Sequence, residues 1–341
     1  MQVSTIGIDI AKNVFQIHGV DDEGKVVISR QLRRKQVIEF FGKIAPCLIG
    51  MEACGTAHHW ARELIKLGHT VRMMPPSYVK GYVKRSKNDA ADAAAICEAV
   101  TRPSMRFVPI KTAEQQAALM LHRARDLLIR QRTQLINALR AHLSEVGLVA
   151  EKGREGVAEL AAIILDDSHA LPPAMKQALQ VILDQLAALQ QQVGALDGGI
   201  RAQHRASDVS RRLETIPGIG VIGATAIAST IVEPSAFKTG RDFAAWIGLV
   251  PRQHSTGGKE KLGGISKQGD RYLRRLLVMG ATAVIQHARR HPEKHRWIMN
   301  LLAKKPAKLV AVAVANKMAR IAWAVMAKGG TYRAPEVAAA A

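Results

Sequence analysis

The chain has 341 residues, of which 48% are hydrophobic, and its formal net charge is +21. This length leaves room for two or three domains, and the hydrophobic content excludes disorder of the whole chain. A positive charge of this size indicates a polyanionic partner, of which nucleic acid is the commonest; a surface that is merely kept soluble by its charge is the alternative.

The apolar and cysteine patterns predict a soluble protein of the cytoplasm. The apolar run from Leu309 to Ala315 ends at Asn316-Lys317, well short of the roughly 20 residues that cross a membrane. The first residues resemble a strand rather than a secretion leader. The three cysteines, Cys47, Cys54 and Cys97, lack metal-ligand spacing, which fits reduced thiols.

The N-terminal stretch from Val3 to Ile10 predicts a buried strand that carries one acid, Asp9. Residues 14–20 and 26–28 continue it as a hairpin around the turn at residues 22–25. A lone carboxylate in a buried strand is costly unless something pairs with its charge. Asp9 therefore either caps a neighbouring backbone group or holds a cation.

The next segment alternates between helix and strand. Residues 37–44 predict a short helix, and residues 47–52 predict a strand that ends in Glu52. A helix over residues 58–67 then leads to a strand over residues 68–74, which is stopped by Pro75-Pro76. This strand, helix, strand order predicts a βαβ unit on a mixed sheet.

A basic stretch precedes an alanine-rich helix at residues 88–96. The basic residues are Lys80, Lys84, Arg85 and Lys87. Asp89 and Asp92 are three positions apart, so both project from one face near the start of the helix. Each is either a helix-capping acid or a member of a site.

Residues 112–212 predict helices only. Apolar residues recur at helical spacing over residues 114–148, and those of residues 178–196 are spaced nearly as the a and d positions of a coiled coil. This apolar seam joins either two copies of the chain or two helices of one copy. Gly198-Gly199 is the predicted hinge into the C-terminal part.

The C-terminal part opens with Ile216-Pro217-Gly218-Ile219-Gly220, ahead of a helix over residues 221–231. This turn is similar to a helix-hairpin-helix, in which Gly218 and Gly220 would present backbone N–H groups to a phosphate. The alternative is a plain tight turn between two helices. A short helix is predicted over residues 237–248.

A glycine-rich loop is predicted from Ser255 to Gly269, and a basic helix follows Asp270. The cationic residues of the loop and helix are Arg252, Lys259, Lys261, Lys267, Arg271, Arg274 and Arg275. From Arg241 to Arg320 there are 17 Lys and Arg against 4 Asp and Glu, a net charge of +13. We expect this segment to bind phosphate backbones.

Four acids stand out in the N-terminal segment: Asp9, Glu52, Asp89 and Asp92. Two end strands and two begin a helix, so they can converge at one edge of a sheet. Oxygen ligands of this kind suit Mg²⁺ or Mn²⁺, which support phosphate chemistry. The sequence therefore predicts a divalent-metal site.

The order of these acids resembles the DEDD tetrad of a ribonuclease H-like domain of the RuvC type. The resemblance extends over nearly the whole chain, through Ile216–Gly220, Gly248-Leu249-Val250-Pro251-Arg252 and Ile265-Ser266-Lys267-Gln268-Gly269. The chain is thus similar to the insertion-sequence transposases of the one-ten family, eleven-eleven subgroup, which include the Piv-type DNA invertases.

The resemblance implies a bacterial, nucleoid-associated DNA recombinase with a RuvC-like domain at residues 1–111 and a helical linker at residues 112–212. A mostly helical C-terminal domain would span residues 213–333, with a tail at residues 334–341. It also implies a homo-oligomer, dimer or tetramer, and a structured noncoding guide RNA, the bridge RNA, which pairs with donor and target DNA.

In this family a serine of the C-terminal domain attacks DNA, and strands exchange through a Holliday junction. We carry that role to Ser255; Thr256 is the alternative, and a purely structural role in a turn is another. Lys259, Lys261 and Lys267 could neutralise charge on the phosphate. Two other functions compete with the recombinase: an actin-like kinase or ATPase, and a non-enzymatic nucleic-acid scaffold.

Overall fold

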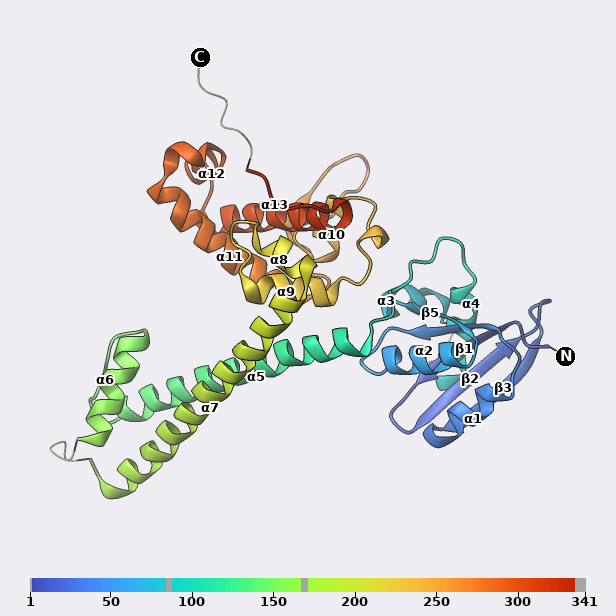
Figure 1. Cartoon of the computed structure of the whole chain (residues 1–341), viewed down its shortest axis with the longest axis horizontal. Helices are drawn as coiled ribbons and strands as arrows, with labels where there is room; N and C mark the ends of the chain where they lie inside the picture. Colours follow the sequence, from blue (N-terminus) through green and yellow to red (C-terminus); the bar gives the residue numbers. More distant parts are fainter. Residues whose placement is uncertain (1, 84–87, 167–170, 335–341) are drawn as a thin grey trace, which may run out of the picture. The chain divides into compact units, whose positions relative to one another are not determined.

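The computed structural model describes residues 2–83, 88–166 and 171–334 (Figure 1). The chain divides into two compact units, Met1–Gln115 and Gln116–Ala341. Of the predicted features, the basic residues Lys84, Arg85 and Lys87 and the tail beyond residue 334 lie outside the described residues.

The first unit contains a mixed five-stranded sheet, as predicted. Its strands are β1 (Thr5–Ile10), β2 (Val14–Val20), β3 (Val26–Arg33), β4 (Leu48–Glu52) and β5 (Thr70–Met74), in the order β3-β2-β1-β4-β5. β1 pairs antiparallel with β2 and parallel with β4. The third strand runs five residues further than predicted, to Arg33, because Leu32 still points into the core with 1% of its surface exposed.

Helices cover both faces of this sheet. They are α1 (Val37–Gly42), α2 (Ala57–Lys66), α3 (Pro76–Val79) and α4 (Asp89–Val100). Successive strand residues point to opposite faces, so Ile6 and Ile8 join the core with α2 while Gly7 lies against α4. The sheet is therefore buried between α2 on one face and α4 on the other.

The second unit begins with helices over the segment that was predicted as a helical linker. They are α5 (Ala113–Ser144), α6 (Arg154–Leu165), α7 (Pro173–Ala206) and α8 (Asp208–Glu214). The guanidinium of Arg132 donates to Gln190 Oε1 at 3.0 Å, so α5 and α7 contact each other within one chain. The seam residues Leu189 and Val193 are only 3% and 5% exposed. The intramolecular helix pair, one of the two predicted alternatives, thus accounts for the burial of these residues.

The hinge predicted at Gly198-Gly199 is wrong, because α7 continues without a break to Ala206. A Cβ added at Gly199 would lie 3.5 Å from the side chain of Leu121. Nearby, Arg125 forms an ion pair with Asp197. Packing on α5 therefore outweighs the low helix propensity of the two glycines.

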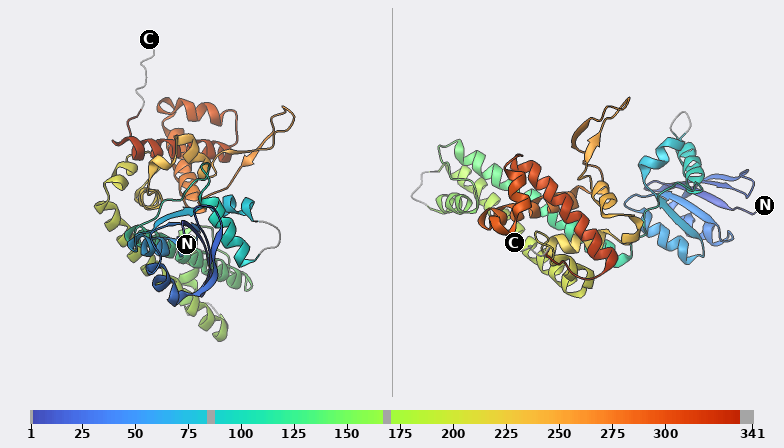
Figure 2. Two further views of the ribbon diagram at one scale, coloured as in Figure 1. Left: turned by 90° about the vertical axis from the view of Figure 1, so that its right-hand side faces the viewer. Right: turned by 90° about the horizontal axis from the view of Figure 1, so that it is seen from above.

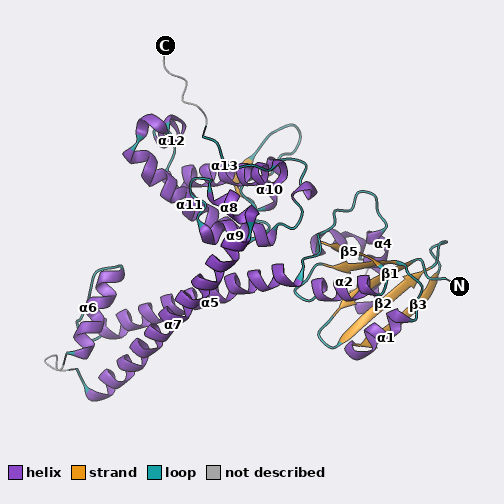
Figure 3. Cartoon of the chain, in the orientation of Figure 1, coloured by secondary structure: helices purple, strands orange, loops and turns teal. Residues whose placement is uncertain are grey.

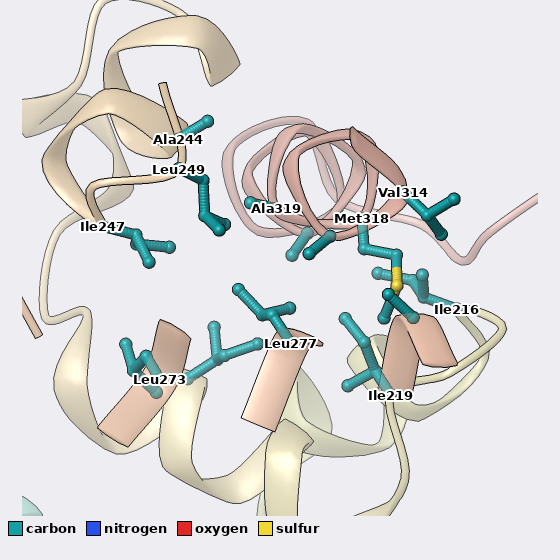
Figure 4. Close-up of a cluster of buried hydrophobic side chains, with 14 of the residues drawn as sticks. Ile216, Ile219, Ala244, Ile247, Leu249, Leu273, Leu277, Val314, Met318 and Ala319 are labelled. Atoms are coloured by element: carbon teal, nitrogen blue, oxygen red, sulfur yellow. The ribbon is translucent and has the colours of Figure 1, made fainter. Parts of the chain in front are cut away.

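The rest of the unit is a helical body around one core (Figures 3 and 4). Its elements are α9 (Val221–Thr230), α10 (Gly240–Trp246), β6 (Pro251–Gln253), β7 (Leu262–Ile265), α11 (Arg271–Arg290), α12 (Arg296–Leu302) and α13 (Ala307–Lys328). In Figure 4, Met318 of α13 points toward Ile216, and Leu277 of α11 belongs to the same cluster of buried side chains.

Helix α13 is long and apolar enough, by length and composition, to cross a membrane. In the structure it packs against α10 and α11 and contributes eight buried residues to the core of the helical body. Its apolar character is therefore explained by its central position in this unit.

Candidate active site

Asp9 and Glu52 are neighbours at the ends of two parallel strands. The register pairs Ile8 of β1 with Met51 of β4, so the next residue on each strand is one of the two acids. Residues in register on adjacent parallel strands point to the same face. Ile8 and Met51 face the core with α2, so Asp9 and Glu52 lie on the opposite face, which α4 covers.

Gly7 allows α4 to lie directly against β1. A Cβ at this position would come within 2.2 Å of the Ala93 carbonyl oxygen and 2.4 Å of the Cys97 nitrogen. The Cys97 thiol donates to the Thr5 carbonyl at 3.6 Å, further back along the strand. Helix α4 thus runs antiparallel to β1, and its first turn lies toward the strand end that carries Asp9.

The first turn of α4 supplies the other two acids. Asn88 caps the helix by accepting a hydrogen bond from the Ala91 N–H at 2.8 Å. Because Asn88 performs this function, neither Asp89 nor Asp92 is needed as the cap. Asp89 is exposed and Asp92 is half-buried. The topology therefore brings all four predicted acids to one edge of the sheet.

The four acids predict a site for a divalent cation. Across residues 2–83, 88–166 and 171–334, no three His, Cys, Asp or Glu side chains are grouped closely enough to hold an ion. The carboxylate oxygens of the four acids fit a hard divalent cation, which keeps several waters and needs few protein ligands.

Ser255 lies on a β-hairpin, where a loop was predicted. The His254 N–H donates to the Lys261 carbonyl at 2.8 Å, and Thr256 and Lys259 exchange backbone hydrogen bonds at 3.3 and 3.1 Å. Gly257 and Gly258, with φ of 55° and 76°, form the two-residue turn. Two consecutive positive φ angles are what a tight hairpin turn requires, and glycine supplies them without strain. The hairpin stands out from the helical body (Figure 2).

The Ser255 hydroxyl is exposed and accepts a hydrogen bond from the Gln253 side-chain amide at 3.1 Å. An amide does not remove a proton, so this neighbour orients the hydroxyl without activating it. Thr256 belongs to the residue pair that closes the turn.

The base of the hairpin is fixed by contacts that only the fold reveals. The Arg274 guanidinium donates to the carbonyls of Ile247 and Gln268, each at 2.7 Å. The Asn316 side-chain amide donates to the Leu249 carbonyl at 3.1 Å. Nothing in the local sequence signals Asn316, because it lies on α13, 67 positions away along the chain. These two side chains hold the ends of the hairpin in place.

The predicted phosphate-binding cations separate into two groups. Arg274 serves the hairpin base, and Arg275 pairs with Asp126 while its guanidinium lies 5.2 Å from the centroid of the Tyr272 ring. The other five cations, whose side chains are exposed, are Arg252, Lys259, Lys261, Lys267 and Arg271. Arg252 donates to the Ser266 carbonyl at 3.3 Å and so lies along the hairpin.

The glycine turn before α9 is packed against α11. Gly218 has φ of 86°, and an added Cβ would lie 2.8 Å from Met318 Cε and 2.9 Å from the Gly280 carbonyl oxygen. Glycine is therefore required here by packing, whatever the turn binds. Gly220, which precedes the first residue of α9, is exposed.

A mixed sheet with four carboxylates at one edge, joined in the same chain to a helical unit with a cationic hairpin, is typical of a nucleic-acid-processing enzyme of the DEDD type. The comparisons with known proteins identify the family. The profile of the "Transposase IS116/IS110/IS902 family" matches residues 210–296, and a DEDD transposase profile matches residues 6–147.

The chain belongs to the IS110/IS116/IS902 family of insertion-sequence transposases, and it is a DNA transposase. It is 50% identical to a "Probable family 20 transposase" of Pseudomonas aeruginosa over 98% of this chain and 99% of that protein. It is 39% identical to the "Transposase for insertion sequence element IS1111A" of Coxiella burnetii, over 97% and 92% of the two chains. A "Pilin gene-inverting protein" of Moraxella bovis is 25% identical over 96% of each chain.

Membership of this family confirms the predicted resemblance, including the relatives that invert DNA. It also favours a transposase over the kinase and the non-enzymatic scaffold that competed with it on sequence alone. Transposases act on DNA, in agreement with the net charge of +21.

Proposed function

We propose that this transposase cuts and rejoins DNA at the ends of its element with two groups: a divalent cation held by the acidic tetrad and the hydroxyl of Ser255. The observation that carries the proposal is the register of β1 and β4, which makes Asp9 and Glu52 neighbours on the face where α4 begins. Asp89 and Asp92 complete the tetrad from the first turn of that helix.

Asp9, Glu52, Asp89 and Asp92 would hold Mg²⁺ or Mn²⁺, and the bound ion would supply charge stabilisation at a phosphate oxygen. The chain's own contribution is to place four acidic side chains at one sheet edge. The N-terminus of α4 also carries a partial positive charge, which is complementary to acidic residues in the first turn of the helix.

Ser255 would attack a phosphodiester of the DNA backbone. The bond that forms joins Ser255 Oγ to phosphorus, and the bond that breaks joins phosphorus to a sugar oxygen, which leaves with the proton as a hydroxyl. When a sugar hydroxyl of a DNA end attacks the phosphoserine, the step is reversed: the strand is rejoined and Ser255 regains its proton. Exposed cations beside the turn, Lys259 and Lys261, would stabilise the charge that develops on the phosphate.

Ser255 is preferred to Thr256 for two reasons. The Thr256 backbone closes the turn, and its β-branched side chain is less free to rotate. The Ser255 hydroxyl is exposed, and its hydrogen bond from Gln253 leaves both the proton and a lone pair available.

The partners that fit this proposal are DNA, a structured noncoding guide RNA and further copies of the chain. The exposed cations of the β-ribbon would contact backbone phosphates, which carry no sequence information, so the choice of sequence would fall to base pairing by the RNA. The tetrad and Ser255 belong to different units, so a dimer or tetramer would allow one copy's acids to act with another copy's serine.

The proposal is tested by trapping a protein–DNA adduct with element-end DNA, guide RNA and Mg²⁺. Ser255→Ala should remove the adduct, and Thr256→Val should retain it. Asp9→Asn should lower adduct formation by orders of magnitude while RNA binding persists. An adduct lost only in Thr256→Val would transfer the role to Thr256, and adducts in both variants would refute a nucleophile on this hairpin.

A further inference from the structure

A cavity of about 1070 Å³ lies beside the hairpin base, within the second unit. Its walls come from the hairpin strands, the first turn of α10, α12 and one side of α13. Gly264 and Ile265 of β7 line it, so it adjoins the ribbon that carries Ser255. Small-molecule sites usually measure roughly 300–1,000 Å³, so there is room for a nucleotide.

The lining combines an exposed aromatic ring with cations. Trp297 of α12 is 43% exposed, and Lys317 Nζ lies 4.4 Å from the centroid of its ring. Arg241, Lys305 and Arg320 also line the cavity, and no Asp or Glu is found among its lining residues in the part of the chain that the structure describes. The remaining walls are mostly aliphatic.

We propose that this cavity binds an unpaired nucleotide of the DNA strand that the hairpin holds. Its base would stack on Trp297, and its phosphates would be neutralised by Arg241, Lys305 and Arg320. The inference rests on the proposed function only in placing DNA at the hairpin. The consequence is that one base of the strand leaves the duplex when the strand engages the hairpin.

Charge complementarity favours a nucleotide over a protein segment. An apolar helix seated here would cover Arg241, Lys305 and Arg320 without an acidic partner from this chain's lining residues, and burying unpaired charge is costly. A nucleotide offers an apolar face for the aliphatic walls and Trp297 together with anionic oxygens for the cations. Base stacking on an aromatic ring is also the usual contact of single-stranded nucleic acid.

Equilibrium binding of oligothymidylate of about twelve nucleotides tests the proposal, since single-strand sites have this size. The full chain with Ser255→Ala is used, without Mg²⁺, so that no cleavage contributes. Trp297→Ala should weaken this binding by about tenfold, and Trp297→Phe should recover most of it. The affinity for a blunt duplex of equal length should change by less than about twofold, because duplex bases are not available for stacking.

A lysine pair gives a second test that does not depend on the tryptophan. Lys305 lines the cavity, whereas its exposed neighbour Lys304 does not. Lys305→Glu should weaken single-strand binding clearly more than Lys304→Glu does. If Trp297→Ala lowers the melting temperature of the protein, its loss of binding cannot be assigned to the cavity, and the comparison of Lys305→Glu with Lys304→Glu then tests the proposal alone.

Four results would overturn the proposal. They are an unchanged affinity of Trp297→Ala, equal effects of the two lysine variants, an equal loss for single strand and duplex, and a loss measured with oligouridylate but not with oligothymidylate, which would place an RNA nucleotide in the cavity. If Ser255 forms no adduct with DNA, the binding test still decides whether the cavity holds a nucleotide. If the cavity holds no nucleotide, the adduct test still decides the role of Ser255.

Discussion

Replacing Gly7 with alanine should separate the acids of the tetrad without removing any of them. The added Cβ would lie 2.2 Å from the Ala93 carbonyl oxygen and 2.4 Å from the Cys97 nitrogen. Both contacts are backbone atoms of α4, so no side chain can rotate away to make room. Either the helix or the strand has to move.

The displacement follows from the geometry. Ordinary contact begins at 3.4 Å, so the 2.2 Å approach needs a shift of 3.4 − 2.2 = 1.2 Å between α4 and β1. Overpacking of this kind costs about 1–3 kcal/mol, of which the better strand propensity of alanine returns about 0.5–1 kcal/mol. We expect a net loss of stability of at most about 2.5 kcal/mol. A misplacement of about 1 Å can lower catalysis by about 100-fold.

The assay compares Gly7→Ala with Gly19→Ala, whose Cβ would meet only side-chain atoms, the nearest at 3.2 Å. Urea unfolding gives the stability, and Mg²⁺-dependent cleavage of element-end DNA gives the activity. Gly7→Ala should remain folded at 25 °C and lose most of its cleavage, while Gly19→Ala should retain both. If Gly7→Ala cleaved as well as Gly19→Ala, α4 would not position Asp89 and Asp92.

Three further predictions concern the second unit. Gly218→Ala should lower the free energy of unfolding by about 2–4 kcal/mol, because it combines a φ of 86° with the contacts to α11 and α13; equal stability in urea would refute this packing. Burial, with a smaller effect of Arg125, lowers the pKa of His122 to about 4. In the unfolded chain His122 takes up a proton near pH 6.5, whereas in the folded chain it does so only near pH 4. The free energy of unfolding should therefore fall by roughly 3 kcal/mol as the pH drops from 6.5 to 4, and His122→Gln should flatten this slope in urea titrations. Leu189→Asp should lower the free energy of unfolding of the protomer by about 3 kcal/mol, whereas Val181→Asp, at a site 63% exposed, should change it by less than about 0.5 kcal/mol. If the two variants had equal melting temperatures, the apolar stripe of residues 178–196 would pack between copies of the chain and not within one copy.

The sheet of the first unit was predictable because its signals are local. Alternating apolar residues give each strand, proline stops β5, and the order of strand, helix and strand gives the parallel pair of β4 and β5. The convergence of Asp9 and Glu52 then follows from the register. What the sequence does not reveal is how close α4 comes, since that depends on Gly7 meeting Cys97, 90 positions later.

The serine hairpin was predicted as a loop because its own residues are poor strand formers. Glycine and lysine make up six of the ten residues 255–264, and strand propensity alone does not favour pairing there. The ribbon is fixed at its base by Arg274, 27 positions after Ile247, and by Asn316, 67 positions after Leu249. Long-range contacts of this kind leave no trace in a local pattern.

Both halves of the proposed site are built on the same principle. The groups that would do chemistry, Asp89 at the start of α4 and Ser255 on the hairpin, are exposed, and a glycine behind each lets two backbones approach closely: Gly7 beneath α4 and Gly248 at the hairpin base, where a Cβ would lie 2.4 Å from the Gln268 carbonyl oxygen. Substitution of the exposed groups should therefore remove chemistry and spare the fold. Substitution of the glycines should alter both, and the ratio of the two effects distinguishes a reacting group from one that positions it.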